Sequence, residues 1–362
     1  MKAVIEAETF STPGKHAGSK RIIRVAVAGA TGYAGLELLR LLARHPQSRV
    51  TRLMSSGRDG KKEFPIEQSH PSLRGKFPVP CQPLSVEALD PSEVDLVFLA
   101  TPHETALEIT PTLLERNLRV VDLSAAFRLK DAAAYPRWYG FEHNAPVVLE
   151  EAVYGLTELN EESIASARLV ANPGCYATSV ILALAPVLRN GWIDAKAGII
   201  SDSKSGASGA GRGLSEKLHF VEVNENCRAY GLFNHRHISE MLKSLDLAED
   251  DFTFTPHLLP ITRGILSTIY VRLTRSRKHE EVVRLYRDFY TRAPFVRLLD
   301  AGVPEIQSVA HTNFMDIGFS IDRGGTRMII VSALDNLIKG AAGQAIQNMN
   351  LMYGFAEGTA LT

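Results

Sequence analysis

The first half of the chain alternates two kinds of apolar pattern: short runs rich in β-branched residues, and stretches in which apolar residues recur at helical spacing. The first kind is typical of a buried strand and the second of an amphipathic helix. Such alternation predicts a parallel sheet with helices on both faces, whose ligands lie at the carboxyl ends of the strands. We expect strands at 22–28, 49–54, 94–100 and 119–124, and helices at 36–42 and 105–116.

Beyond residue 172 the pattern changes. Asp322-Arg323-Gly324-Gly325 lies between two apolar runs and is typical of a β-hairpin, so a mixed sheet is predicted in this part of the chain. Residues 59–90 hold five prolines and show little periodicity, and we expect an irregular excursion there. The other elements expected are strands at 198–203, 264–273, 316–321 and 328–332, and helices after Pro173 and at 238–246, 279–290 and 336–352.

A glycine motif separates the first predicted strand from the first predicted helix. Glycines at this spacing allow a tight turn and let the backbone approach a pyrophosphate, which the helix N-terminus then binds. Its place at the head of a βα series favours a dinucleotide site over a glycine-rich packing turn. The residues assigned to cofactor binding here are Gly29, Thr31, Gly32, Tyr33, Ala34 and Gly35.

The second predicted strand ends in Ser55-Ser56-Gly57-Arg58, where an NAD site usually presents a carboxylate to the adenine ribose. Hydroxyl groups with an arginine, and no acid, suit a 2′-phosphate. We therefore expect NADP(H), with contacts from Ser55, Ser56 and Arg58. Because Lys61 and Lys62 follow, a solvated basic loop stays open as the alternative.

One thiol is expected at the start of a helix. Asn172 is a suitable N-cap, Pro173 suits the first helical position, and Val180, Ile181, Leu184 and Leu188 continue at helical spacing, so Cys175 falls in the first turn. Unpaired N–H groups and the helix dipole stabilise an anion there, which predicts a lowered thiol pKa and a nucleophilic cysteine. The alternative is a small buried cysteine that only fills space.

Two further segments carry polar side chains that suit chemistry. Residues 204–212 form a loop of small residues between Lys204 and Arg212, which could wrap an anion or serve as a flexible linker. His235 and His237 precede the predicted helix at 238–246. No third ligand accompanies the two histidines, so we expect no metal and assign them to proton transfer beside the thiol.

Composition limits the class of protein. The chain has 362 residues, and Lys plus Arg equals Asp plus Glu at 40 each, so no net field favours nucleic acid or an anionic membrane. Three scattered cysteines match neither a disulfide framework nor a metal site, which indicates a reducing, cytoplasmic location. No apolar run is long enough for a membrane helix, and residues 1–21 are expected to be a solvated tail.

Together these features fit one reaction class. A thiolate attacks an activated acyl carbon, the leaving group departs, and hydride from NADPH reduces the thioester to a thiohemiacetal that collapses to an aldehyde. A phosphate leaving group would give the loop at 204–212 an obvious task. An acyl phosphate is the softer part of this interpretation, since other thiol-dependent dehydrogenases share the remaining features.

The motifs GATGYAG, ANPGCYATS, SGASGAGR, HRHISE and DNLIKGAAGQAIQNMNLM together resemble the N-acetyl-γ-glutamyl-phosphate reductase family of arginine biosynthesis, within the aspartate-semialdehyde dehydrogenase superfamily. The resemblance runs from about residue 22 to the C-terminus. It implies that Cys175 is the nucleophile, that Asn336 lies near the cofactor and that the second domain forms the subunit interface. Ser239 stands where the family often has proline, and the N-terminal tail is extra.

The resulting expectation is an α/β fold: a doubly wound Rossmann-type parallel sheet plus an α+β catalytic and dimerisation domain with a mixed sheet. The expected divisions are a tail at 1–21, an NADP-binding domain at 22–172 completed by the C-terminal helix at 335–362, and the catalytic domain at 173–334. His237 is the expected acid/base and His235 the second choice. Further assignments are Ser205, Gly206 and Asn336 to the cofactor, and Arg128, Asn172, Ser208, Arg212 and Glu240 to the substrate.

The expected function is NADPH-dependent reduction of N-acetylglutamyl 5-phosphate to the 5-semialdehyde, with release of inorganic phosphate, by a homodimer or homotetramer. Two alternatives stay open. One is the related reductase of lysine biosynthesis, which acts on a carrier-linked aminoadipyl phosphate. The other is a non-catalytic NADP-binding scaffold, which would have no need of Cys175 together with His237.

Overall fold

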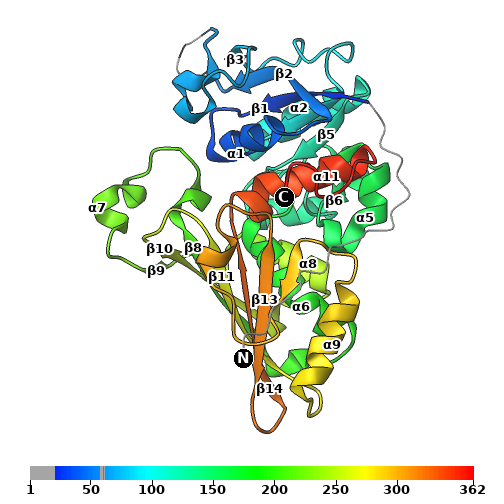
Figure 1. Cartoon of the computed structure of the whole chain (residues 1–362), viewed down its shortest axis with the longest axis vertical. Coiled ribbons are helices and arrows are strands. Elements are labelled where there is room, and N and C mark those ends of the chain that lie inside the picture. Colours follow the sequence, from blue (N-terminus) through cyan, green and yellow to red (C-terminus); the bar gives the residue numbers. More distant parts are fainter. Residues whose placement is uncertain (1–20, 58–59, 61) are drawn as a thin grey trace, which may run out of the picture.

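The computed structural model describes residues 21–57, 60 and 62–362, so the expected N-terminal tail and Arg58 lie outside the described residues. The described chain forms two sheets of seven strands each, one all parallel and one mixed (Figure 1). The predicted fold class, a doubly wound parallel sheet beside a mixed sheet, is confirmed.

The parallel sheet has the strand order β3-β2-β1-β4-β5-β7-β6. Its strands are β1 (Ile23–Ala28), β2 (Ser48–Ser55), β3 (Cys81–Pro83), β4 (Leu96–Leu99), β5 (Arg119–Asp122), β6 (Val153–Tyr154) and β7 (Leu169–Ala171). Its helices are α1 (Tyr33–Leu42), α2 (His103–Glu115), α3 (Tyr135–Tyr139), α4 (Pro146–Glu151) and α5 (Thr157–Ser166).

Side chains alternate across β1, which shows how the two faces of the parallel sheet are covered. Val25 and Val27 join a core with Leu38 of α1 and Ile346 of the C-terminal helix α11 (Gly343–Met352). Ala26 and Ala28 face the other way, into a core with α2. The last helix of the chain therefore returns to the first sheet and packs beside its first helix (Figure 1).

The mixed sheet has the order β12-β13-β14-β11-β8-β10-β9. Its strands are β8 (Ile199–Gly206), β9 (Arg228–Ala229), β10 (Phe252–Leu259), β11 (Ile265–Arg272), β12 (Val296–Leu298), β13 (Met315–Ile321) and β14 (Arg327–Leu334). The helices of this half are α6 (Cys175–Arg189), α7 (Phe220–Val223), α8 (His237–Leu245), α9 (His279–Phe289) and α10 (Ile306–Val309), followed by a π-helical turn at Ile338–Ala342.

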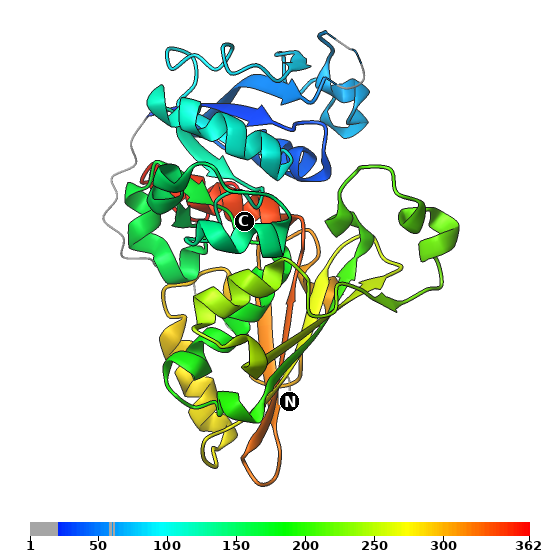
Figure 2. The ribbon, with the colours of Figure 1, turned by 180° about the vertical axis from the view of Figure 1, so that it is seen from behind.

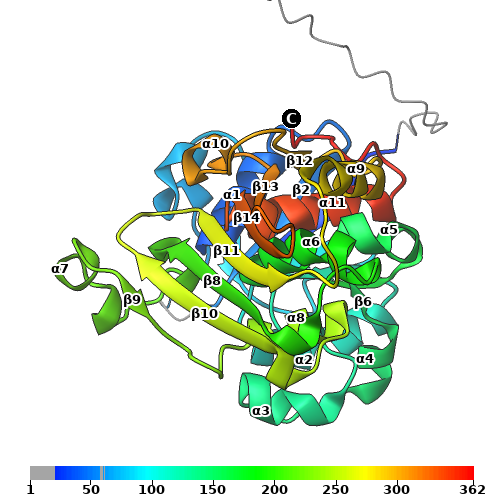
Figure 3. The ribbon, with the colours of Figure 1, turned by 90° about the horizontal axis from the view of Figure 1, so that it is seen from below.

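One face of the mixed sheet is covered by helices, and the other is open. Ile265, Ile269 and Ile330 pack in one core with α6, α8 and α9, which Figure 3 shows along one side of the sheet. On the opposite face Ile200 and Tyr270 remain exposed. Residues 212–234, here called the arm, carry α7 and β9 and project from the same half of the molecule (Figure 2).

The prediction of an irregular excursion at 59–90 is wrong at one place. Within it, β3 pairs in parallel with β2, with Leu53 opposite Cys81. This strand has only three residues and prolines nearby, so it carries no readable alternation and is tolerated because it lies at the edge of the sheet. β10 was also absent from the predicted elements, since Pro256 in its middle argues against a strand.

Candidate active site

The glycine motif forms the tight turn that the sequence predicts. Gly29 follows β1 with a φ of +85°, and a methyl group added there would stand 2.1 Å from the carbonyl oxygen of Ala100. Gly32 is the N-cap of α1 and makes no side-chain cap, and the first turn of α1 holds no acidic residue. The helix N-terminus is therefore free of side chains that would compete with a phosphate, and its residues fit a dinucleotide.

The end of β2 lies directly beside this turn. The backbone N–H groups of Gly29 and Ala30 both donate to the carbonyl oxygen of Met54, at 2.9 Å each. Ser55 is the last residue of β2 and is buried. The hydroxyl groups predicted to contact the adenosine end of the cofactor are thus next to the predicted pyrophosphate site. Their part in cofactor choice stays a prediction, as does that of Arg58.

Cys175 lies in the first turn of α6, as predicted, but it is the first residue of this helix, and the cap differs from the prediction. The N-cap is Gly174, and Pro173 lies outside the helix, so the assignment of Asn172 as N-cap is wrong. The Asn172 amide instead donates to the carbonyl oxygen of Ala341 at 3.1 Å. Its own side-chain oxygen accepts a hydrogen bond from Asn348 at 3.0 Å. Asn172 therefore ties the loop before the thiol to the C-terminal segment of the chain.

The carboxylate of Glu240 provides what Asn172 does not. Its Oε2 accepts the backbone N–H of Gly174 at 2.9 Å and the hydroxyl of Tyr154 at 2.7 Å. Its Oε1 forms a buried ion pair with Arg128 at 3.0 Å. Arg128 also donates to the carbonyl oxygen of Asn172 at 2.9 Å. This pair holds the backbone on both sides of Pro173, and in this structure Arg128 and Glu240 are engaged with protein groups.

His237 is the first residue of α8, and its ring lies against the backbone that precedes the thiol. A methyl group on Gly174 would stand 2.4 Å from Nε2 of His237. His235 lies 4.8 Å from His237 between ring centroids, and both rings meet Tyr176 edge to face. His237 Nδ1 is buried without a hydrogen-bond partner. His237 thus lies beside Gly174, the residue before Cys175, and its Nδ1 is not committed to a hydrogen bond with a described protein group.

Burial sets the protonation states of the site. It raises the pKa of the Cys175 thiol, although the Tyr176 N–H group and the charge of Arg128 act in the opposite direction. The expectation of a lowered thiol pKa is therefore wrong for this structure, because the shielding from water exceeds the effect of the helix start. Burial also lowers the pKa of His235 to about 4 and that of His237 well below its ordinary value. A neutral thiol beside a neutral imidazole can form the reactive ion pair by proton transfer.

The loop predicted at 204–212 is more ordered than its composition indicates. β8 continues to Gly206, so Lys204 lies on a strand and pairs with Asp202 at 3.0 Å. Lys204 thus does not bracket the loop as predicted. Arg212 donates to the carbonyl oxygen of Thr31 at 2.8 Å, which links the arm to the glycine turn.

Asn336 and the same loop meet at one point. The Asn336 amide donates to the Ser208 hydroxyl at 3.0 Å and accepts the backbone N–H of Gly264 at 2.7 Å. Ser205 and Gly206 precede this contact at the end of β8, and both are buried. The three residues predicted to contact the cofactor from the second half of the chain are therefore close to one another.

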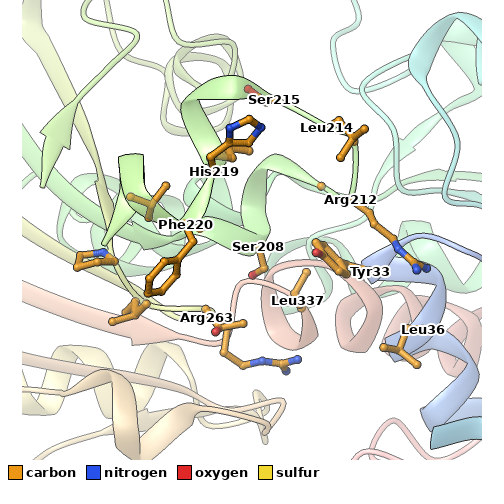
Figure 4. A pocket seen from close by; sticks show the side chains of 18 of the residues that line it. Tyr33, Leu36, Ser208, Arg212, Leu214, Ser215, His219, Phe220, Arg263 and Leu337 are labelled. Carbon is orange, nitrogen blue, oxygen red and sulfur yellow. The ribbon is translucent and has the colours of Figure 1, made fainter. Parts of the chain in front are cut away.

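A cavity of about 710 Å³ lies between α1 and the arm. In Figure 4 Tyr33 and Leu36 of α1 face Arg212 and Leu214 of the arm, and Ser208 lies at the same cavity. The cavity thus adjoins the predicted substrate loop. No cluster of three or more potential metal ligands occurs among the described residues, and none of their helices is long and apolar enough to cross a membrane.

Sequence reasoning missed the aromatic residues that complete the site. Tyr154 donates to Glu240, and Tyr139 lies within 3.4 Å of the same carboxylate. Both come from short segments before β7 that carried no motif, and the sequence holds no signal that would pair them with a glutamate 86 and 101 residues further on. Tyr176 was part of the recognised cysteine motif, but its packing against both histidines depends on the tertiary fold.

Comparisons with known proteins agree with this geometry. Residues 24–167 match the family model described as semialdehyde dehydrogenase, NAD binding domain, and residues 175–336 match semialdehyde dehydrogenase, dimerisation domain. Aspartate semialdehyde dehydrogenase II of Vibrio cholerae has a similar fold, with a TM-score of 0.68 and 19% identity, over 92% of this chain and 99% of that one. The two domain matches, together covering most of the chain, assign it to the semialdehyde dehydrogenase class of proteins.

Sequence relatives narrow the class. The N-acetyl-gamma-glutamyl-phosphate reductase of Pelotomaculum thermopropionicum is 48% identical over 343 residues, covering 94% of this chain and 97% of the relative. That of Geobacter sulfurreducens is 50% identical over 349 residues, covering 94% and 98%. The chain belongs to the N-acetyl-γ-glutamyl-phosphate reductase family.

Proposed function

We propose that this protein reduces N-acetylglutamyl 5-phosphate with NADPH, giving N-acetylglutamate 5-semialdehyde and inorganic phosphate. The observation that carries the proposal is the thiol of Cys175, at the first residue of α6 beside His237, in a chain of this family. The carrier-linked aminoadipyl substrate is not favoured, because relatives that match nearly the whole chain bear the N-acetyl-γ-glutamyl name.

In the first half of the reaction the neutral His237 imidazole takes the proton of Cys175, directly or through water. The thiolate attacks the acyl carbon, the bond to phosphate breaks, and a thioester forms on Cys175. The positive charge of Arg128 lies close enough to lower the thiol pKa and favours this ionisation. Ser208 and Arg212 are our assignment for the phosphate, on the loop that follows β8.

In the second half the thioester carbon is reduced and the aldehyde leaves. NADPH held at the glycine turn would supply the hydride. His237, now protonated, gives its proton to the developing oxyanion. When the thiohemiacetal collapses, its hydroxyl returns that proton to His237 and Cys175 departs as thiolate, which then takes the proton back and restores the neutral pair. The buried position of His237 suits both steps, since a shielded imidazole exchanges its proton with the reacting atoms rather than with bulk water.

The cofactor assignment rests on the uncapped start of α1 and on the absence of an acid at the end of β2. Gly29 to Gly35 would hold the pyrophosphate, Ser55, Ser56 and Arg58 the 2′-phosphate end, and Ser205, Gly206 and Asn336 the nicotinamide end. The division at residues 172 and 335, with α11 completing the cofactor domain, is supported by the packing of α11 on the parallel sheet.

We also propose that two copies associate through the open face of the mixed sheet, in a homodimer or a dimer of dimers. Ile200, Tyr270 and Ile329 from three neighbouring strands are exposed there. The arm adds Leu214, Phe220 and Phe233, also exposed. A cytoplasmic location fits the three cysteines, none of which forms a disulfide in the described part of the chain.

The reverse reaction provides a direct test. Purified protein is mixed with N-acetylglutamate semialdehyde, NADP⁺ and inorganic phosphate, and NADPH formation is followed by its absorbance. The proposal requires NADPH formation that depends on phosphate and disappears in Cys175→Ala. Phosphate-independent oxidation would exclude the acyl phosphate, and activity confined to a carrier-linked aminoadipyl semialdehyde would assign the other substrate. Light scattering of the same sample measures the number of subunits.

A further inference from the structure

A lysine is fully buried close to the proposed nucleophile. Lys339 lies in the π-helical turn at 338–342 and has no exposed surface. Its ammonium group pairs with the carboxylate of Glu158 at the start of α5, which is equally buried, and donates to Gln347 Oε1 at 2.7 Å. Removing two opposite charges from water costs several kcal/mol for each ion, so such a pair is weak evidence for a gain in stability.

The pair belongs to a larger polar network inside the molecule. The Gln347 amide donates to Glu357 at 2.7 Å and to the Thr157 hydroxyl at 3.1 Å. Asn313 donates to Gln347 Oε1 at 2.7 Å. The network joins α5, α11 and the segment before β13, and all of these groups lie around the π-helical turn. The proposed reaction steps use none of these polar groups, so the presence of a buried polar network at this place needs another explanation.

The π-helical turn contacts the proposed nucleophile through Gly340, the residue after Lys339. A methyl group on Gly340 would stand 2.6 Å from the Cβ atom of Cys175. The following carbonyl, that of Ala341, accepts the Asn172 amide at 3.1 Å. The turn therefore holds the helix start of Cys175 directly and the loop before it through Asn172.

The hydrogen bonds of the turn explain why it needs an anchor. Gly340 donates to the carbonyl oxygen of Asp335 and Ala342 to that of Leu337, each at 2.9 Å and each five residues back. In an α-helix each N–H group donates to the carbonyl oxygen four residues back. Relaxation to that spacing would rotate the following residues by about 100° around the helix axis. Wide turns of this kind are uncommon and occur often at functional sites. A charge fixed at Lys339 opposes the relaxation, because it would pull the ammonium group away from Glu158.

We propose that Lys339, paired with Glu158, is a positioning residue for Cys175: the ion pair keeps the π-helical turn in register, so that Gly340 and Ala341 hold the thiol in its reactive place. The proposal rests on the proposed function as far as turnover is concerned. The effect of Lys339 on the reactivity of the Cys175 thiol does not depend on turnover and is measured separately by alkylation.

Three variants test the proposal. Lys339→Met keeps the length of the side chain and removes its charge, and Lys339→Met/Glu158→Gln removes both charges. Asp316→Asn is the matched control, because Asp316 is a buried carboxylate paired with Arg297 on the mixed sheet, at 2.6 Å. Each protein is compared with wild type for melting temperature, NADPH affinity, kcat and KM, and for the rate of Cys175 alkylation by iodoacetamide against pH, read from the Cys175 peptide by mass spectrometry.

The expected result for Lys339→Met is a kcat about 10- to 100-fold lower, the range caused by small misplacements of reacting groups, with KM and NADPH affinity within about threefold of wild type. In Lys339→Met the pH midpoint of Cys175 alkylation differs from that of wild type. In Asp316→Asn this midpoint is the same as in wild type. The double variant keeps the lowered kcat and the altered midpoint, because the turn has lost its charged anchor, while its melting temperature recovers towards that of wild type, since a neutral pair leaves no unpaired buried charge.

A lowered melting temperature with unchanged kcat and unchanged alkylation profile would overturn the proposal and leave Lys339 a purely structural role. If Lys339→Met does not fold, Glu158→Gln keeps an oxygen acceptor for Lys339 and takes its place in the same comparison. Should wild type fail to reduce the acyl phosphate, the proposed function fails, and the alkylation profiles still decide the positioning role.

Discussion

Nε2 of His237 lies so close to Gly174 that a methyl group at this glycine would stand 2.4 Å from it. Gly174 is the N-cap of α6 and the residue before Cys175, so this contact fixes how the imidazole approaches the nucleophile. The contact depends on the missing side chain, not on an unusual backbone angle, since Gly174 has a φ of −70°. The carboxylate of Glu240 also fixes Gly174, because it accepts the backbone N–H of this glycine.

Gly174→Ala should therefore lower kcat by about 100-fold or more, because a displacement near 1 Å at a reacting group has effects of that size. NADPH affinity should change little. Gly213→Ala is the control, since a methyl group there meets no atom within 4 Å. Steady-state kinetics and a crystal structure of the variant check this. Normal turnover in Gly174→Ala would show that the His237 position is not critical.

The two histidines should separate in kinetics. His237→Asn should lower kcat by about 10²–10⁴, the usual contribution of a general acid/base, and remove one limb of the pH–rate profile. His235→Asn should mainly raise KM for the acyl substrate, because His235 reaches the site through Tyr176 and His237. The reverse pattern would exchange the roles, and two mild effects would mean that another group or water carries the proton.

The thiol offers a test that needs no substrate. Cys175→Ala should abolish turnover and leave NADPH binding nearly intact. The glycine turn proposed to hold the cofactor follows β1 of the parallel sheet, whereas α6 packs on the mixed sheet. In wild type near neutral pH, iodoacetamide should modify the exposed Cys227 faster than Cys175, because burial raises the pKa of the Cys175 thiol. Buried Cys81 should react slowest. Faster labelling of Cys175 than of Cys227 would indicate a stabilised thiolate and contradict the pKa direction.

Local patterns explain why so much of the fold was predictable. The strand, turn and helix around Gly29 are determined by residues adjacent in sequence and were predicted correctly, and Cys175 lies in the first turn of its helix as expected, although the cap of that helix differs. The hairpin around Asp322 was predicted correctly too. Short strands such as β3, and β10 with its internal proline, are stabilised by neighbours far away in sequence and leave little local trace.

The site was predictable in its residues and less so in their partners. The sequence predicts Asn172 as an N-cap, but its side-chain oxygen accepts a hydrogen bond from Asn348, which is distant in sequence. Glu240, on another helix, accepts the backbone N–H of Gly174 instead. The thiol pKa was misjudged for the same reason: the helix start is visible in the sequence, and the burial that outweighs it is not. In the sequence Lys339 is a single charge beside small and apolar residues, and only the fold shows that its side chain is fully buried.

Cofactor choice tests the end of β2. Wild type should prefer NADP(H) over NAD(H), and Arg58→Ala should reduce that preference by about 1–3 kcal/mol, the usual contribution of a charge-assisted hydrogen bond. Lys62→Ala is the control for general positive charge in the same segment. The ratio of kcat/KM for the two cofactors measures the effect. Equal use of both cofactors by wild type would refute this interpretation of Ser55-Ser56-Gly57-Arg58.

Stability should depend on pH through the buried histidines. The folded protein lowers the pKa of His235 to about 4, so between about pH 6.5 and pH 4 the unfolded chain binds a proton that the folded chain does not. Stability must then fall as pH falls through this window, and His237 acts in the same direction. Asp122 opposes it, because burial raises its pKa to about 6 and its protonation favours the folded state at low pH.

The variant His235→Asn isolates one contribution from this balance. Between about pH 7 and pH 4.5, wild type should lose more free energy of unfolding than His235→Asn by about 1–2 kcal/mol, less than full burial would give because the His235 ring keeps some exposure. Urea unfolding of both proteins at the two pH values measures the difference. Parallel losses in the two proteins would mean that His235 titrates alike in the folded and unfolded chains, and its imidazole would then be accessible to protons from water in the folded site.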